Sequence, residues 1–149
     1  MKMAVLMNHQ LSSTQKAEAQ GALGVQSFVA MPPEVAALWC NADPAKDLHE
    51  LGAENVICWL TEQTEEGDYV IVQGDYGLTF AVVDWCLKTG RVPVHATTER
   101  KAVEKNIQGN IVVERVFNHV KFRVYKSISD KGNRNGQRIY KFCRFGKPK

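Results

Sequence analysis

Three short segments of this sequence carry side chains suited to holding a phosphorylated ligand. They span residues 8–13, 73–77 and 95–101, and each follows an apolar run and precedes a predicted helix start. Free backbone N–H groups at a helix start attract phosphate, and glycine lets the backbone approach it closely. The candidate ligand-binding residues are Asn8, Gln10, Ser12, Ser13, Gln73, Gly74, Tyr76, Gly77, Thr97, Thr98 and Lys101, with His119 from a later predicted turn.

Each of these signals also has an ordinary structural explanation. Ser12 and Ser13 are typical helix caps, and the Thr97-Thr98 pair suits the same role. Residues 74–77 match neither the GxGxxG dinucleotide fingerprint nor the GxxxxGKS phosphate loop. The prediction of a site therefore rests on the convergence of three such segments at one edge of a sheet.

The elements that would position these segments follow from the apolar pattern. The order of strands and helices predicts an α/β three-layer sandwich, Rossmann-like, with a mostly parallel sheet and a C-terminal β-hairpin. Ligands of such folds bind beyond the carboxyl ends of the strands. Strands are expected at 3–7, 25–31, 69–74 and 92–96, helices at 13–24, 33–39, 45–62 and 78–89, a helical turn or two at 99–105, and a hairpin of 110–117 with 120–126.

Composition sets the class of protein. The chain has 149 residues, 44% hydrophobic and 23% charged, which is typical of one globular domain. No apolar run reaches the roughly 18–20 residues of a membrane span, and the first ten residues do not resemble a signal peptide. We therefore expect a cytoplasmic protein without a membrane partner. The four cysteines show no CxxC spacing, so we expect reduced thiols and no metal site.

Charge is distributed unevenly along the chain. Residues 121–149 hold ten Lys/Arg and one Asp, a net charge of +9, whereas the first 120 residues carry −6. Such a basic end favours a polyanionic partner, with nucleotide or RNA as the first candidates. A solubilising tail is the alternative explanation.

Several motifs together resemble a known family. They are NHQLSSTQ, LGV, MPPEVAALW, GDYVIVQGDYG, GRVPVHATTERKAVE and VFNHVKFRVY. They resemble the small single-domain ring nucleases of type III CRISPR systems, compact members of the Csx group that are related in fold to CARF sensor domains. The resemblance runs from Met1 to about Tyr125. It divides the chain into a CARF-like domain at 1–126 and a basic C-terminal extension at 127–149.

The resemblance implies a homodimer that binds cyclic oligoadenylate, with cyclic tetra-adenylate as the expected ring size, across its two-fold axis. Such enzymes cut this second messenger to linear di-adenylate with a 2′,3′-cyclic phosphate and so switch off antiviral signalling. The reaction needs no metal, cofactor or long nucleic acid, because a ribose 2′-hydroxyl attacks the adjacent phosphorus. The protein has to supply positioning, charge and acid/base help.

Three residues are the candidates for catalysis. His9 is the first choice for acid/base work, because histidine titrates near neutrality and His9 stands at a strand end beside a helix start. Arg100, or Lys101, would stabilise charge on the reacting phosphate. Asp75 is either a base or a hydrogen-bond partner of a ribose hydroxyl.

Two other classes of function remain open from the sequence. The same fold could sense or sequester cyclic oligoadenylate without cutting it. The basic end could bind single-stranded RNA, since aromatic residues alternate with its cations. These aromatic residues are Phe122, Tyr125, Tyr140, Phe142 and Phe145.

Overall fold

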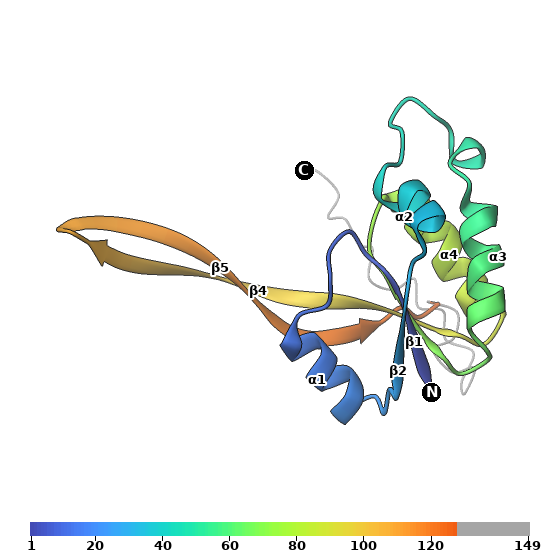
Figure 1. The fold of residues 1–149 in the computed structure, drawn as a ribbon, viewed down its shortest axis with the longest axis horizontal. Coiled ribbons are helices and arrows are strands. Elements are labelled where there is room, and N and C mark those ends of the chain that lie inside the picture. Colours follow the sequence, from blue (N-terminus) through green and yellow to red (C-terminus); the bar gives the residue numbers. More distant parts are fainter. Residues whose placement is uncertain (128–149) are drawn as a thin grey trace, which may run out of the picture.

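A five-stranded sheet with strand order β2-β1-β3-β4-β5 organises the computed structural model, which describes residues 1–127. The first four strands are parallel, and β5 is antiparallel to β4. The elements are β1 (Lys2–Leu6), α1 (Ser13–Gly21), β2 (Ser27–Ala30), α2 (Pro33–Cys40), the 3-10 helix η1 (Leu48–Glu50), α3 (Ala53–Gln63), β3 (Tyr69–Val72), α4 (Tyr76–Lys88), β4 (Val92–Ile107) and β5 (Asn110–Val124). The prediction of an α/β fold with a mostly parallel sheet flanked by helices is confirmed (Figure 1).

Helices cover both faces of this sheet, one on the first face and three on the second (Figure 1). Along β3, Val70 and Val72 pack in the core under α2, α3 and α4, whereas Ile71 packs in the core on the α1 side. All three side chains are fully buried. A strand covered on both faces needs apolar residues at every position, which explains the unbroken run of residues 69–72.

The predicted helix over 45–62 is shorter in the structure. Gly52 adopts a left-handed conformation with φ of 75°, and α3 begins only after it, at Ala53. Within residues 45–51 of the predicted helix, only the 3-10 helix η1 forms. A left-handed residue cannot continue a right-handed helix, so the apolar spacing on the two sides of Gly52 belongs to two separate elements.

The predicted C-terminal hairpin is wrong in its boundaries. Residues 110–124 form one strand without a turn at Asn118-His119, and residues 99–105 are strand rather than helix. The real turn is Gln108-Gly109, where φ is 51° and 85°. A two-residue turn with positive φ at both positions matches the twist of paired strands. Pairing with β5 therefore decides the conformation of residues 99–105, although the spacing of their charges favours a helix.

Most of this strand pair projects beyond the body of the protein as an arm, which we define as residues 98–118 (Figure 1). The pairing of β4 with β3 ends at Ile71 and Val94. The next residues of β4 run past the carboxyl edge of the parallel sheet, paired only with β5. Ten residues, 98–107, extend about 33 Å at about 3.3 Å per residue, and all ten are exposed. The arm is thus a two-stranded ribbon with both faces exposed.

A buried carboxylate holds the amino-terminal strand in place. Asp68 accepts hydrogen bonds from the backbone N–H of Lys2 at 2.8 Å and of Glu65 at 3.0 Å. Burial by itself would raise the pKa of Asp68, but these two bonds and the nearby positive charges lower it below its ordinary value. Asp68 thereby fixes the start of β1, the strand that leads to His9.

Asp68→Asn is expected to lower the free energy of unfolding at pH 7 by about 1–3 kcal/mol, because an amide cannot accept both bonds with full charge. A carboxyl with a lowered pKa stabilises the fold above its unfolded pKa, and that stabilisation is lost as pH falls through the folded value. The free energy of unfolding, measured by urea denaturation, should therefore fall less between pH 7 and pH 3 for Asp68→Asn than for wild type. The exposed neighbour variant Glu65→Gln should behave as wild type, and an equal pH response of Asp68→Asn and wild type would contradict this role.

No helix within residues 1–127 is long and apolar enough to cross a lipid bilayer.

Candidate functional site

The sheet topology marks one edge as the place for a ligand. From β1 the chain crosses to β2 through α1 on one face, and from β3 it crosses to β4 through α4 on the other. The strand order therefore reverses between β1 and β3. In open α/β sheets, the crevice outside the carboxyl ends at such a reversal is the usual binding site. The segments after Leu6 and after Val72 both begin there.

A pocket of about 440 Å³ opens beside the end of β1. Its polar lining comes from Asn8, His9 and Gln10 in the loop after β1 and from Lys16 on α1. The remaining lining is mostly apolar: Val5, Met7, Leu11, Phe28, Ala30, Met31, Ala36 and Cys40. An apolar wall with a few convergent polar groups suits a flat base next to a charged or hydroxylated portion of a ligand. Three of the predicted residues are thus brought together with a cation.

His9 is exposed at this pocket, and its Nδ1 lies 3.1 Å from the carbonyl oxygen of Gln10. When Nδ1–H donates to that oxygen, Nε2 carries the lone pair. The contact therefore favours the tautomer in which Nε2 can accept a proton from a bound hydroxyl. This is the form that a general base requires.

Ser12 caps α1. Its side-chain oxygen accepts from the backbone N–H of Gln15 at 3.2 Å, and the Gln15 side chain accepts from the Ser12 backbone N–H at 2.9 Å. This reciprocal arrangement is a capping box. The ordinary explanation of Ser12 as a cap is confirmed, and Ser13 is the first residue of the helix. Ligand binding by these two serines stays a prediction.

The second predicted segment forms the turn from β3 into α4. Asp75 caps α4, because its Oδ1 accepts from the backbone N–H of Gly77 at 2.9 Å and of Leu78 at 3.0 Å. Tyr76, next to this cap, has 93% of its surface exposed. Asp75 therefore stabilises the start of α4, and its part in catalysis stays a prediction. Tyr76 is exposed at this edge, and the stacking of a base on it stays a prediction.

Gly74 is required by packing. The indole Nε1 of Trp39 donates to the carbonyl oxygen of Gln73 at 3.1 Å. A Cβ on Gly74 would lie 2.8 Å from that Nε1 and 2.9 Å from Cε2. Trp39 itself is buried in the core of α2, α3 and α4. The glycine thus lets the turn after β3 lie directly on the indole.

Gly74→Ala is expected to lower the free energy of unfolding by about 1–3 kcal/mol, because the rigid indole must move and its hydrogen bond to Gln73 is disturbed. Gly21→Ala provides the matched control, since a Cβ there meets nothing within 4 Å and Gly21 has no positive φ. That control should be neutral or slightly stabilising. Thermal unfolding followed by tryptophan fluorescence measures both, and equal stabilities would contradict the packing role.

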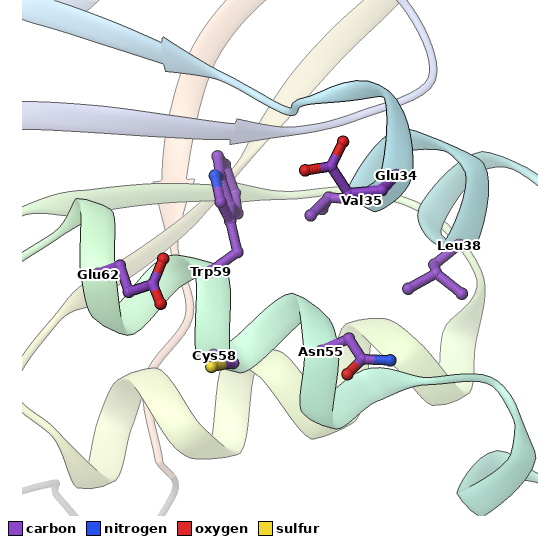
Figure 2. A pocket seen from close by; sticks show the side chains of 7 residues that line it. All are labelled: Glu34, Val35, Leu38, Asn55, Cys58, Trp59 and Glu62. Carbon is purple, nitrogen blue, oxygen red and sulfur yellow. The ribbon is translucent and has the colours of Figure 1, made fainter.

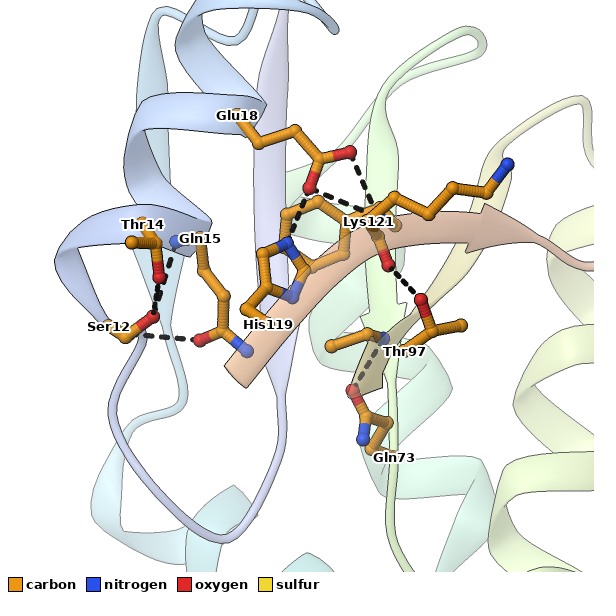
Figure 3. Close-up of polar contacts among 10 residues, drawn as sticks. Ser12, Thr14, Gln15, Glu18, Gln73, Thr97, His119 and Lys121 are labelled. Atoms are coloured by element: carbon orange, nitrogen blue, oxygen red, sulfur yellow. Dashed lines mark hydrogen bonds and ion pairs between the residues drawn. The ribbon is translucent and has the colours of Figure 1, made fainter. Parts of the chain in front are cut away.

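The third predicted segment lies in β4, at the base of the arm (Figure 3). The side-chain oxygen of Gln73 accepts from the backbone N–H of Ala96 at 2.8 Å and so joins the end of β3 to β4. The Thr97 hydroxyl donates to the carbonyl oxygen of Lys121 at 2.9 Å. Thr97 and Thr98 are therefore paired strand residues and do not cap a helix, which corrects that alternative.

Arg100 and Lys101 occupy opposite faces of the arm, because successive side chains of a strand alternate. The Arg100 guanidinium lies 5.0 Å from the ring centre of Phe117, and the Lys101 ammonium lies 3.3 Å from Glu99. The two cations are thus not interchangeable at one phosphate. Neither of them is among the residues that line the pocket beside His9.

His119 lies inside β5, and its side chain is only 6% exposed. Its Nε2 is hydrogen-bonded to the Glu18 carboxylate of α1, and Glu18 also accepts from the backbone N–H of Phe122 (Figure 3). The imidazole also packs on the Phe122 ring, with 4.9 Å between ring centres. His119 therefore joins α1 to the base of the arm, and contact with a ligand stays a prediction.

Family membership follows from comparison with other sequences. A family model described as the uncharacterized protein MJ1673 family matches residues 1–123. The chain belongs to this family. The uncharacterized protein MJ1673 of Methanocaldococcus jannaschii is 32% identical over 124 residues, which cover 83% of this chain and 96% of that relative. No solved structure matches the chain.

The region matched to the MJ1673 family includes the pocket beside His9, the turn into α4 and the whole arm. Neither description names a substrate, so the chemistry rests on the residues themselves. Within residues 1–127, no group of three or more His, Cys, Asp or Glu side chains could hold a metal ion.

A second pocket of this MJ1673-family protein, of about 350 Å³, lies between α2 and α3 (Figure 2). Its lining consists of Glu34, Val35, Leu38, Asn55, Cys58, Trp59 and Glu62. Two carboxylates and no cation in the lining disfavour a phosphorylated ligand. The pocket beside His9 is therefore the better candidate for one.

Sequence reasoning missed two polar residues of importance. Lys16 lines the pocket beside His9, and Glu18 joins α1 to β5. Both lie in the segment TQKAEAQ, which the sequence predicts only as a helix. A cation one turn after a helix cap was the available signal for Lys16, whereas the partner of Glu18 is more than 100 residues away.

Proposed function

We propose that this protein is a ring nuclease, a metal-independent phosphodiesterase that cleaves cyclic oligoadenylate. The observation that carries this proposal is the pocket beside the carboxyl end of β1. There, His9, two side-chain amides and Lys16 face a largely apolar wall. This lining offers a proton acceptor, hydrogen bonds for a base or ribose, and a positive charge for phosphate. The resemblance of the motifs to the ring nucleases supports the same reaction.

The proposed reaction is an internal transfer at phosphorus. The ribose 2′-hydroxyl gives up its proton to His9 and bonds to the adjacent phosphorus, while the bond from phosphorus to the 5′-oxygen breaks and that oxygen takes a proton. The products end in a 2′,3′-cyclic phosphate. Two such cuts convert cyclic tetra-adenylate into two linear di-adenylates and so end type III CRISPR signalling.

The chain acts as a homodimer with a CARF-like, Rossmann-like arrangement in this proposal. A two-fold dimer suits a cyclic ligand of even symmetry, because each protomer presents the same residues to half of the ring. Lys16 at each pocket would offset part of the charge of the four phosphates.

The deciding experiment is incubation of the full chain with radiolabelled cyclic tetra-adenylate in EDTA, followed by chromatography. Linear di-adenylate with a cyclic phosphate end is the expected product. Retention of intact ring by the protein without cleavage would instead indicate a sensor or sequestering module. Absence of both binding and cleavage would overturn the proposal.

The RNA-binding alternative loses two of its aromatic residues in the structure. Phe122 is buried in the core on the α1 side. Tyr125 packs against the opposite core, and its hydroxyl donates to the carbonyl oxygen of Val72 at 3.1 Å. Neither ring face is offered to a stacked base. Tyr140, Phe142 and Phe145 lie outside the described residues.

Deletion of residues 127–149 is expected to leave the cleavage rate within about threefold of the full chain, because the pocket beside His9 and the family match both lie before them. Any contribution of their charge to ligand capture should weaken as salt rises. Single-turnover assays at two ionic strengths measure this. A folded but inactive truncation at low salt would place the extension in the site.

A further inference from the structure

The arm presents apolar side chains that nothing in the described chain covers. One face carries Ile111, Val113 and Phe117 from β5, with exposed fractions of 70%, 56% and 57%. An isolated two-stranded ribbon is at best marginally stable in water and gains stability by packing on another surface. Because the arm projects past the edge of its own sheet, that surface has to come from elsewhere.

The body exposes an apolar patch of its own, along the outer side of α4. Tyr76 and Phe80 are one helical turn apart and therefore lie on the same side of the helix, with exposed fractions of 93% and 70%. Leu48 of η1 lies next to Gly77 and is also exposed. A helix such as α4, with apolar residues on all sides, is typical of a buried position. We call Leu48, Tyr76 and Phe80 the α4 patch.

The net charges of the arm and of the body have opposite signs. Residues 1–97 hold five Lys/Arg and twelve Asp/Glu, whereas the arm holds four Lys/Arg and three Asp/Glu. Lys101 and Lys105 form ion pairs with Glu99 and Glu114 on one face of the arm. Arg100, Arg115 and Glu104 lie on the other face, which therefore has a net charge of +1, together with the exposed Ile111, Val113 and Phe117. On the body, Asp75 and Asp84 flank the α4 patch, and Asp84 forms an ion pair with Lys88 at 2.7 Å, so these three side chains together carry a net charge of −1.

We propose that two copies of this chain exchange arms, so that the face with Val113 and Phe117 packs on the α4 patch of the partner. Under two-fold symmetry this one contact forms twice and leaves neither surface exposed. A ribbon about 33 Å long and about 10 Å wide presents about 330 Å² on one face. Two arms and two recipient patches bury about 1,300 Å², which lies within the range of about 1,200–2,000 Å² for stable interfaces.

The arm exchange specifies which surfaces of the proposed homodimer meet, and it does not depend on whether the protein cleaves a ligand. Its test is the oligomeric state of the full chain, measured by sedimentation velocity over a range of concentrations without ligand. A ligand-cleavage assay is run separately, so failure of either proposal is seen independently. The wild type is expected to sediment as a dimer.

Two matched arm variants separate the faces. Val113→Asp is expected to raise the dimer dissociation constant at least about 30-fold, because it places a charge in the centre of the interface. Val112→Asp, on the opposite face and similarly exposed at 45%, should leave dissociation within about threefold of wild type. Both positions are exposed, so neither change removes a core contact.

A variant of the patch identifies what the arm contacts. Phe80→Asp should dissociate the dimer as strongly as Val113→Asp. A mixture of these two variants should associate more tightly than either variant alone, since the intact arm of one can pack on the intact patch of the other and restores one of the two contacts. A monomeric wild type, a dimer insensitive to Val113→Asp, or a Phe80→Asp chain that remains dimeric would each overturn the arm exchange.

Discussion

His9→Ala is expected to slow single-turnover cleavage of cyclic tetra-adenylate by about 10²–10⁴-fold, the usual contribution of a general acid or base. The pocket beside His9 keeps its other polar groups in this variant, so the dissociation constant of the ligand should change little. Quench-flow with enzyme in excess measures the rate, and filter binding measures the affinity.

The matched control for that experiment is His49→Ala, because His49 is also an exposed histidine but belongs to η1 and does not line the pocket. It should cleave as wild type does. Equal rates for His9→Ala and wild type would remove His9 from the mechanism and leave Asp75 and the Thr97-Thr98 segment as the next residues to test.

Glu18→Ala is expected to lower the free energy of unfolding by about 2–4 kcal/mol. The variant leaves two buried polar groups without their partner, the backbone N–H of Phe122 and the imidazole of His119. Unpaired buried groups of this kind cost about 1–3 kcal/mol each. Urea denaturation measures the loss.

Gln20→Ala is the control for Glu18→Ala, since Gln20 is an exposed residue of the same helix and alanine favours the helix. Amide hydrogen exchange adds a second readout. Backbone amides at the base of the arm should exchange faster in Glu18→Ala than in wild type, and unchanged exchange with unchanged stability would contradict the joining role of Glu18.

The parts of the fold that sequence predicted well have local causes. The run of residues 69–72 is apolar because both faces of β3 are buried, and Ser12 caps a helix through a bond within three residues. The position of the loop that holds His9, between a strand end and a helix start, could be predicted for the same reason, since both are visible locally; its role in a site stays a prediction.

The arm could not be predicted in this way. The segment ERKAVEK has charges and alanine at helical spacing, and its strand conformation depends on pairing with residues 112–118. The separation of Arg100 from Lys101 onto two faces is a consequence of that pairing. The hydrogen bond of Glu18 with His119 joins residues 101 positions apart. Interactions over such separations leave no periodic signal in one sequence.

The bulge in β5 has a consequence for how the arm can change. Thr97 pairs with Lys121 and Thr98 with His119, so Val120 is one residue extra on the β5 side. This bulge determines which side chains of β5 in the arm lie on the same face as Phe122. With it, Phe122 in the core is followed on the same side by residues 119, 117, 115, 113 and 111. If Val120 instead paired with Thr98 and no residue were left over, that side would carry residues 120, 118, 116, 114 and 112. Closing the bulge in this way would turn the arginine-bearing side of β5 over while leaving the sheet core untouched, whereas loss of Val120 itself would keep residues 119, 117, 115, 113 and 111 on the Phe122 side and so preserve the face that the arm offers to a partner.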